Sequence, residues 1–193
     1  MLSLEESLKI LKETNALLEG HFILSSGLHS PQYVQCAKLM SKPEKAHKIC
    51  ASLSEKIINE FKDFDLVLSP AIGGIVIGYE IGKLLKKETI FSERVDGKFV
   101  LRRDFLIKKN QRVLIVEDVI TTGKSSLECS VLAEKLGAEI IGFASLIDRT
   151  GGKSEINKKI VSQIKLDIST FTADNIPENL KKLKAIKPGS RNL

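Results

Sequence analysis

The sequence predicts an α/β fold with a central, mainly parallel sheet flanked by helices. The strongest sign is RVLIVED at 112–118, an unbroken apolar run that ends in two acids and is typical of a buried strand. Such runs alternate with glycine turns and helix-like segments from about residue 65 to 148, a succession that builds parallel sheets. The 193 residues are 42% hydrophobic and contain no repeat or low-complexity linker, so we expect one domain spanning 1–193.

The first third of the chain is less regular. Leucines recur at helical spacing over residues 3–18, which predicts an opening amphipathic helix. The segment GHFILSSGLHSPQYVQ at 20–35 interrupts this pattern with Gly, Ser and Pro, and predicts short strands joined by turns. Pro43 favours a helix start, and residues 43–61 are predicted to be helical.

The alternating part of the chain predicts where a ligand binds. Its expected elements are a strand at 65–69, a helix from 73 to about 87, a strand at 89–94, the strand at 112–118, a helix from about 123 to 136 and a strand at 139–148. Ligands of such sheets bind beyond the carboxyl ends of the strands. Three of these ends carry glycines, hydroxyls or charges, at 69–74, 117–125 and 148–152. We expect the ligand-binding site where these three strand ends meet.

Positive charge is concentrated rather than spread. The formal charge is +6, and residues 94–112 alone hold seven bases and two acids. Basic surfaces can bind nucleic acid, but neither this segment nor the lysine-rich tail at 153–193 interleaves bases with aromatic residues, and Trp is absent. We therefore expect no nucleic-acid partner and a solvated surface for the tail. For residues 94–112 two interpretations stay open: the bases bind a small polyphosphate ligand, or they form a solvated surface.

Cysteine and histidine usage points to a reducing cytoplasm. Three scattered cysteines (Cys36, Cys50, Cys129) form no C-x-x-C pair, so neither a disulfide framework nor a zinc site is expected. The three histidines (His21, His29, His47) show no metal-ligand spacing either. No run approaches the ~18 apolar residues of a membrane span, and the opening MLSLEESLKILKE mixes acids with bases, unlike a signal or transit peptide.

The segment VLIVEDVITTGKSS at 113–126 carries the chemistry. Glu117 and Asp118 end a buried strand, and hydroxyls, Gly123 and Lys124 then lead into a helix. Free N–H groups and the helix dipole make such a start a cradle for phosphate. Carboxylates directly before it suit a ligand whose hydroxyls lie near a phosphate, as in ribose 5-phosphate. A plain acid-capped helix start is the structural alternative.

The nucleotide P-loop is the obvious competitor, because Gly123-Lys124-Ser125 matches its last three positions. That motif requires a glycine five residues before Gly123, where this chain has Asp118. The P-loop interpretation therefore fails.

The acid pair and T-T-G loop resemble the 5-phosphoribosyl 1-pyrophosphate (PRPP) motif of the type I phosphoribosyltransferases. Residues 20–35 are similar to the hood that covers the base in the orotate phosphoribosyltransferase family, with the pattern Gly-x-Phe-x-Leu-x-Ser-Gly-x-x-Ser-Pro. LIDRTGG at 146–152 resembles that family's strand end, and KPGSR at 187–191 resembles the C-terminus of one bacterial branch. The resemblance implies the type I fold, with a small hood from about 1–40 plus the C-terminal segment.

The resemblance also implies an activity: transfer of ribose 5-phosphate from PRPP to N1 of orotate, giving orotidine 5′-monophosphate and pyrophosphate in pyrimidine synthesis. Magnesium is the implied cofactor, held mainly by PRPP rather than by protein ligands. The implied PRPP-binding residues are Glu117, Asp118, Val119, Ile120, Thr121, Thr122, Gly123, Lys124, Ser125, Ile72 and Gly73. The implied orotate-binding residues are Thr121, Arg149, Tyr33 and Val34. Glu117 and Asp118 are also the implied catalytic pair.

In the family, a mobile basic loop closes over PRPP and reaches the other subunit of a homodimer. The candidates for its catalytic base are Arg94, Lys98, Arg102 and Arg103. The chain departs from one branch of the family here, because the Arg-Lys-x-x-x-Lys-x-His run of that branch is absent. Ser25 stands where that branch has a PRPP-binding lysine, and Ile72-Gly73 replaces its Tyr-Lys. IPEN at 176–179 replaces the Cys-x-x-Cys that usually precedes KPGSR.

Two other functions stay open on the sequence alone. A purine-type phosphoribosyltransferase shares the acid loop but not the GLHSP segment of the hood. A regulator that keeps the PRPP site as a sensor and binds nucleic acid would need a DNA-binding domain or an RNA-binding face, and no spare helix-turn-helix length precedes the hood.

Overall fold

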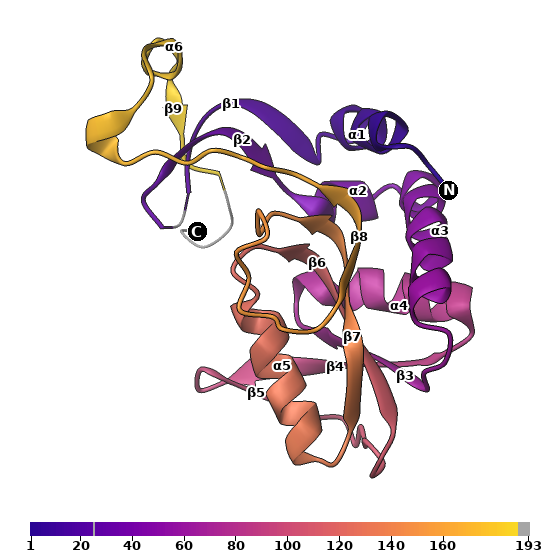
Figure 1. Ribbon diagram of the computed structural model, residues 1–193. Coiled ribbons are helices and arrows are strands. Elements are labelled where there is room, and N and C mark those ends of the chain that lie inside the picture. The colour runs from indigo at the N-terminus through magenta and orange to yellow at the C-terminus, as the bar shows by residue number, and fades with distance from the viewer. Residues whose placement is uncertain (25, 189–193) are drawn as a thin grey trace.

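The computed structural model describes residues 1–24 and 26–188, and its main feature is a six-stranded sheet of order β5-β4-β3-β6-β7-β8 (Figure 1). Its strands are β3 (Leu66–Pro70), β4 (Glu88–Val95), β5 (Lys98–Val100), β6 (Arg112–Ile120), β7 (Glu139–Asp148) and β8 (Ile160–Lys165). Neighbouring strands are parallel except β4 and β5, which form an antiparallel hairpin. The predicted α/β fold with a mainly parallel sheet is confirmed.

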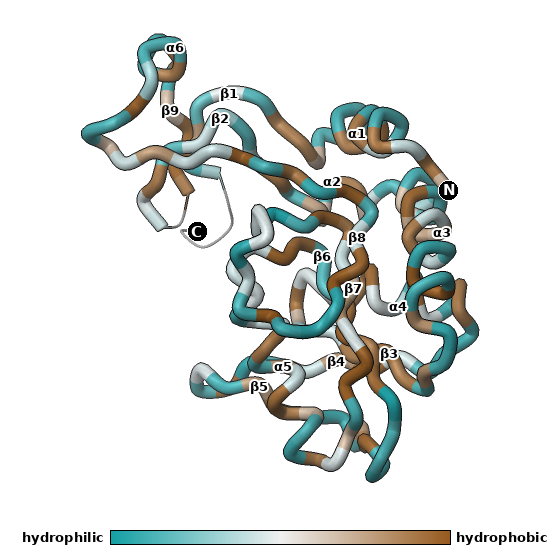
Figure 2. The backbone as a smooth tube through the Cα atoms, in the orientation of Figure 1, coloured by the Kyte–Doolittle hydropathy of each residue, from teal (hydrophilic) through white to brown (hydrophobic). Residues whose placement is uncertain are grey.

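Helices cover both faces of this sheet. The helices α1 (Leu4–Glu13), α2 (Cys36–Met40), α3 (Pro43–Glu60) and α4 (Gly73–Leu85) share one apolar core, and α5 (Lys124–Lys135) belongs to the other. Successive residues of a central strand go to opposite cores: Val67 joins the first, and Leu66 and Leu68 join the second. The middle stretches of the central strands are therefore mainly apolar on both faces, as Figure 2 shows for the middle of the molecule.

A second, three-stranded sheet joins the two ends of the chain, and we call it the hood. It consists of β1 (Leu17–Ile23), β2 (His29–Val34) and the short β9 (Ala185–Ile186). The strand β1 pairs antiparallel with β2 and parallel with β9, which follows a short 3-10 turn (Ala173–Asn175) and α6 (Glu178–Lys181). Buried His21 adds a side-chain link, because its Nδ1 lies 3.2 Å from the Leu183 carbonyl and donates to it.

The opening helix is shorter than predicted. A capping box between Ser3 and Glu6 begins it, but α1 ends at Glu13 rather than near residue 18. The Thr14 hydroxyl donates to the Ile10 carbonyl at 2.8 Å, and Asn15 takes a left-handed φ of 54°. Asparagine tolerates that conformation better than most residues do, so the chain reverses there and Leu18 enters β1 instead of the helix.

The strand β8 corrects the prediction that the tail from residue 153 is simply a solvated surface. Val161 and Ile164 pack into the core, and Gln163 is buried and donates to the Ser7 hydroxyl at 2.8 Å. The strand is short, mixed in polarity and flanked by lysines, so its hydrophobic signal is weak. Ser25 and residues 189–191 of the KPGSR motif lie outside the described residues. None of the helices in the described chain is both long and apolar enough to cross a membrane.

Candidate active site

The three predicted strand ends meet at one edge of the large sheet. Because β3, β6 and β7 are neighbouring parallel strands, their carboxyl ends lie side by side. Gly73, which begins α4 after β3, lies so close to the acid pair that a Cβ there would be 2.8 Å from Asp118 Oδ2. The Arg149 amide, directly after β7, donates to the Ile120 carbonyl at 2.8 Å. The convergence expected from the sequence is therefore present.

The acid pair is largely removed from solvent and has no cationic partner in the described part of the chain. Neither Glu117 nor Asp118 forms an ion pair within residues 1–24 and 26–188. Ser126 Oγ donates to Glu117 Oε2, and the Val119 amide donates to Asp118 Oδ1 at 2.9 Å. Burial raises the pKa of Glu117 to about 7; the Ser126 hydrogen bond opposes that shift and the Asp118 charge adds to it. Burial also raises the pKa of Asp118.

The loop after the acids ends in a helix start that faces outward. Thr121, Thr122 and Lys124 are exposed, and the Lys124 amide donates to Thr122 Oγ1 at 3.3 Å. Gly123 is buried with a left-handed φ of 82°, and a Cβ there would be 2.7 Å from Ser154 Oγ. Glycine is required at this position both by its φ and by that close approach. The first turn of α5, with Lys124 and half-buried Ser125, thus presents its amides at the edge of the sheet.

The remaining residues of the predicted PRPP set contribute mainly backbone. Ile120 is buried in the core, and Val119 is partly buried and packs against the other core. Ile72 is exposed at the start of α4, where the Ala71–Ile72 peptide bond is cis. Ile72 and Gly73 thus place main-chain groups, rather than polar side chains, beside the acid pair.

Arg149 is half-buried and incompletely paired. Its Nε is buried and has no hydrogen-bond partner in the described part of the chain. Burial lowers the pKa of the guanidinium without removing its charge. A desolvated guanidinium with an unused donor is a fitting partner for a planar, carboxylate-bearing ligand, which it can bind in a bidentate manner.

The predicted base-contacting residues of the hood lie at the end of β2. Tyr33 is partly buried with its ring centroid 5.7 Å from that of Phe22, and Val34 packs against the core. Two residues later, the Cys36 thiol donates to the Asp118 carbonyl at 3.9 Å. The chain leaving the hood therefore runs directly beneath the acid pair.

Comparison with known proteins agrees with this geometry. The family model of the phosphoribosyl transferase domain matches residues 40–180. A curated orotate phosphoribosyltransferase of Parvibaculum lavamentivorans is 45% identical over 190 residues, which is 98% of each chain. This chain belongs to the orotate phosphoribosyltransferase family.

Solved structures show the same fold. The orotate phosphoribosyltransferase of Aeropyrum pernix superposes with a TM-score of 0.70 at 25% identity, covering 82% of this chain and 92% of its own. That of Mycobacterium tuberculosis H37Rv superposes with a TM-score of 0.65 at 21% identity, covering 83% and 95%. The latter likeness concerns the fold alone.

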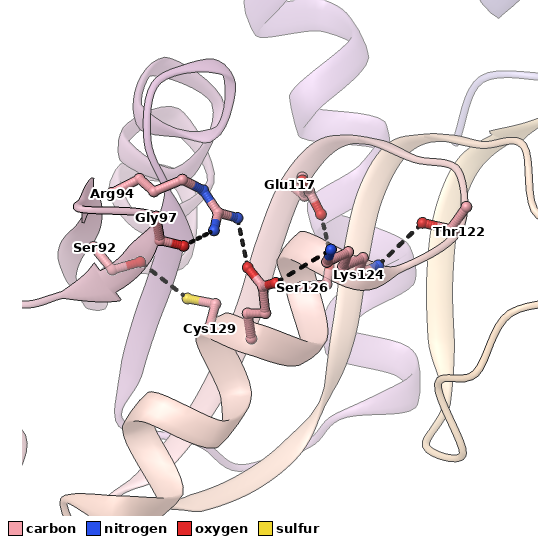
Figure 3. Close-up of polar contacts among 9 residues, drawn as sticks. Ser92, Arg94, Gly97, Glu117, Thr122, Lys124, Ser126 and Cys129 are labelled. Atoms are coloured by element: carbon pink, nitrogen blue, oxygen red, sulfur yellow. Dashed lines mark hydrogen bonds and ion pairs between the residues drawn. The ribbon is translucent and has the colours of Figure 1, made fainter. Parts of the chain in front are cut away.

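The four candidate bases of this family member do not contact the acid pair in the structure. Arg94 on β4 donates to the Gly97 carbonyl at 2.6 Å (Figure 3). It also donates to Glu128 Oε2 at 2.5 Å. Its guanidinium also lies 4.2 Å from the centroid of the Phe99 ring. Arg103 pairs with Glu93. Lys98 and Arg102 are exposed and form no ion pair with any described residue.

Sequence reasoning missed Ser126. It is fully buried on the first turn of α5, and its hydroxyl reaches back to Glu117 on β6 (Figure 3). The second serine of GKSS was the available signal, because a polar side chain on the inward face of a helix needs a hydrogen-bond partner.

Proposed function

We propose that this protein is an orotate phosphoribosyltransferase that moves the 5-phosphoribosyl group from PRPP to N1 of orotate. The products are orotidine 5′-monophosphate and pyrophosphate. The observation that carries this proposal is the meeting, at one sheet edge, of a partly buried acid pair without an ionic partner among the described residues, an outward-facing helix start and an incompletely paired arginine. The whole chain, including the hood, acts as one catalytic unit in this proposal.

The acid loop binds the ribose 5-phosphate part of PRPP. Glu117 and Asp118 accept hydrogen bonds from the 2′ and 3′ hydroxyls, and the amides of residues 121–125 bind the 5′-phosphate. The anomeric carbon gains positive charge as pyrophosphate leaves, so two nearby carboxylates stabilise the transition state. No covalent nucleophile is needed, because positioning and electrostatics supply the rate enhancement.

The pyrophosphate side takes magnesium. Within the described residues no group of three or more His, Cys, Asp or Glu side chains is arranged as a metal site. Mg²⁺ keeps several of its waters and binds chiefly through phosphate oxygens, so PRPP itself would hold the ion with few protein ligands. When bound, the ion neutralises charge on the leaving pyrophosphate. The amides at Ile72 and Gly73 contact the same anion.

Orotate lies between the strand end of β7 and the hood. Arg149 binds its carboxylate, and Thr121 contacts the ring from the loop. Tyr33 and Val34 form the cover, which is supported by the run of β2 toward Asp118. Closure of the hood and of the basic segment excludes water from the reactive centre.

A homodimer is supported by an apolar face on α4. Val76 is 51% exposed and Tyr79 is 65% exposed, and together with Met40 and Pro43 they line a groove of about 480 Å³ between α2, α3 and α4. The exposed Ile72 lies at the start of the same helix, so a second copy bound here would adjoin the PRPP site. The basic segment 94–112 of each subunit then reaches the site of the other. Light scattering of wild type and Tyr79→Glu checks the interface, and a monomeric wild type would refute it.

A reducing, cytoplasmic location is supported by the thiols. Cys36, Cys50 and Cys129 are all free and buried, and burial raises the pKa of each of them. Such thiols behave as small core residues and gain nothing from an oxidising compartment.

The test follows the absorbance of orotate after addition of PRPP and magnesium, with adenine and hypoxanthine as parallel bases. We expect magnesium-dependent loss of orotate, and a drop of at least about a hundredfold in kcat for Asp118→Asn. Turnover of a purine instead would refute the base assignment. Binding of PRPP with no turnover of any base would refute the enzymatic function and favour a PRPP sensor.

A further inference from the structure

Ser126 contacts a proposed catalytic group from the buried side of the acid loop. Its side chain is fully buried, and its hydroxyl donates to Glu117 Oε2 across the gap between α5 and β6. Among the described residues, this is the one hydrogen bond that the Glu117 carboxyl group makes to the protein, so its Oε1 stays available. The hydroxyl therefore holds one oxygen of the carboxylate and leaves the other for a ligand.

A serine inside a helix normally uses its hydroxyl in another way. It donates to a main-chain carbonyl three or four residues earlier, which satisfies the hydroxyl locally. Ser130, one turn further along α5, does this, because its Oγ donates to the Leu127 carbonyl at 2.9 Å. Ser126 instead uses its hydroxyl across an element boundary. The two serines are a matched pair on one helix, and only the first is coupled to the site.

The charge around Glu117 makes this hydrogen bond important. Asp118 lies next to it on β6, and Lys124, Glu128 and Cys129 lie on α5. On the neighbouring strand β7, the charged residue nearest the end is Asp148, which lies opposite Ile120 in the sheet register. The strand β3 and the first two turns of α4 carry no charged side chain. Lys124 is exposed and lies 4.0 Å from Glu128 rather than against Glu117. No cation among residues 1–24 and 26–188 pairs with Glu117, and the hydroxyl of Ser126 is the hydrogen-bond donor that its carboxyl group has there.

We propose that Ser126 is a positioning residue for the transfer reaction: its hydroxyl fixes the Glu117 carboxylate and keeps it ionised as an acceptor for the ribose hydroxyls of PRPP. This inference rests on the proposed function. A protonated Glu117 would present a donor where an acceptor is needed, and a freely rotating one would lose its alignment with the sugar. The Ser126 hydroxyl opposes the burial-driven rise in the pKa of Glu117, in agreement with this role.

The test compares Ser126→Ala with Ser130→Ala. At pH 7 we expect Ser126→Ala to lower kcat/KM for PRPP by about tenfold, the size of one hydrogen bond to a charged group. The acid limb of the kcat/KM profile moves to higher pH in Ser126→Ala, because the carboxylate is harder to ionise. Ser130→Ala, with the same loss of one buried hydroxyl, leaves both the rate and the profile unchanged. Thermal melting of both variants separates folding from function.

A double-mutant cycle decides whether Ser126 acts through Glu117. In a Glu117→Gln background, Ser126→Ala should cost less than twofold further, because the group that it positions is already altered. An undiminished tenfold loss in that background would overturn the proposal. Tighter PRPP binding by Ser126→Ala would overturn it too, because the serine would then be holding Glu117 away from the ligand.

Calorimetric titration with PRPP alone separates this inference from the proposed function. The titration needs no base, so it reports on Ser126 and Glu117 even where orotate is not the acceptor. We expect weaker PRPP binding in Ser126→Ala than in Ser130→Ala. Equal affinities for PRPP would refute the role of Ser126, whereas a wild type that binds PRPP and turns over no orotate would refute the proposed function alone.

Discussion

The acid loop at 117–126 and the basic hairpin formed by β4, β5 and the residues up to Arg103 use charge in opposite ways. In the acid loop, Glu117 and Asp118 are largely removed from solvent and form no ion pair with any described residue. In the hairpin, Arg94 and Arg103 are exposed, each paired with a glutamate and each stacked near a phenylalanine ring. A charge that is paired is satisfied within the protein. A charge that is removed from solvent and left unpaired is available to a ligand. We therefore expect Glu117 and Asp118 to act on the ligand, and Arg94 and Arg103 to support the structure of the hairpin.

The largest expected effect comes from filling the space beside the acid pair. A methyl group in Gly73→Ala would lie 2.8 Å from Asp118 Oδ2 and would have to displace that carboxylate. Because an error of about 1 Å in a catalytic geometry can cost a hundredfold, we expect kcat/KM for PRPP to fall by about that factor. Gly137→Ala is the control, because Gly137 follows the far end of α5 and a Cβ there would meet no atom nearer than 3.4 Å. Its left-handed φ of 91° costs stability but should leave turnover intact. A fully active Gly73→Ala would contradict the prediction.

The next effect concerns the unused donor of Arg149. Arg149→Lys keeps the charge but loses the planar fork, so we expect KM for orotate to rise by about tenfold while KM for PRPP changes little. Steady-state kinetics with each substrate varied in turn measure both constants. Arg103 is an exposed arginine of the hairpin, and Arg103→Lys serves as the matched control. A rise in KM for PRPP alone would show that Arg149 binds PRPP rather than orotate.

The buried charge of Glu117 predicts a pH-dependent stability. Folding raises its pKa from 4.5 to about 7, so between these values the folded chain holds more protons than the unfolded chain. Stability contributed by this group therefore falls as pH rises through that window. Glu117→Gln removes the effect, and we expect it to increase the free energy of unfolding at pH 8 by up to about 3 kcal/mol and to change it little near pH 4. Urea unfolding at both pH values checks this, and a variant destabilised at pH 8 would count against it.

The smallest effects belong to the paired arginines. Arg94→Ala and Arg103→Ala each lose an exposed ion pair and an aromatic contact, so we expect a drop of about 2 °C in Tm and less than a twofold change in kcat. Lys98→Ala and Arg102→Ala remove exposed bases that pair with nothing described. They should spare Tm and lower kcat more than the arginine variants do. A large loss of kcat in Arg94→Ala would show that it leaves Glu128 to act on PRPP.

Sequence patterns predicted the central sheet well because burial on both faces leaves an unmistakable signal. The strand β6 and the glycine turn into α5 could be located from RVLIVED and TTGKSS alone. The end of α1 could not, because leucine spacing carries on past Glu13 while Asn15 reverses the backbone. The strand β8 was hidden by its mixed polarity.

The residues of the candidate site likewise fall into those that the sequence predicted and those that it did not. Glu117 and Asp118 were predicted from their place at a strand end and Arg149 from the resemblance of LIDRTGG to the family, and the sheet brings these strand ends together. The closeness of Gly73 to Asp118 and the contact of Ser126 with Glu117 depend on how two helices pack on β6. The partners of Arg94 and Arg103 likewise depend on the β4–β5 hairpin, because Glu128 is 34 residues away from Arg94 in the sequence. Contacts between elements of this kind leave no periodic trace in a sequence.

The pairing of β9 with β1 sets an order for biosynthesis. The hood joins residues 21–22 to residues 185–186, so its third strand forms only when almost the entire chain has been made. The residues of the sheet edge that carries Glu117, Asp118 and Arg149 are synthesised before that point, since proteins emerge and fold from the N-terminus. We therefore expect a nascent chain to form the proposed phosphate cradle before the hood is complete, and a truncation at the C-terminus to remove β9 and leave that sheet edge in place.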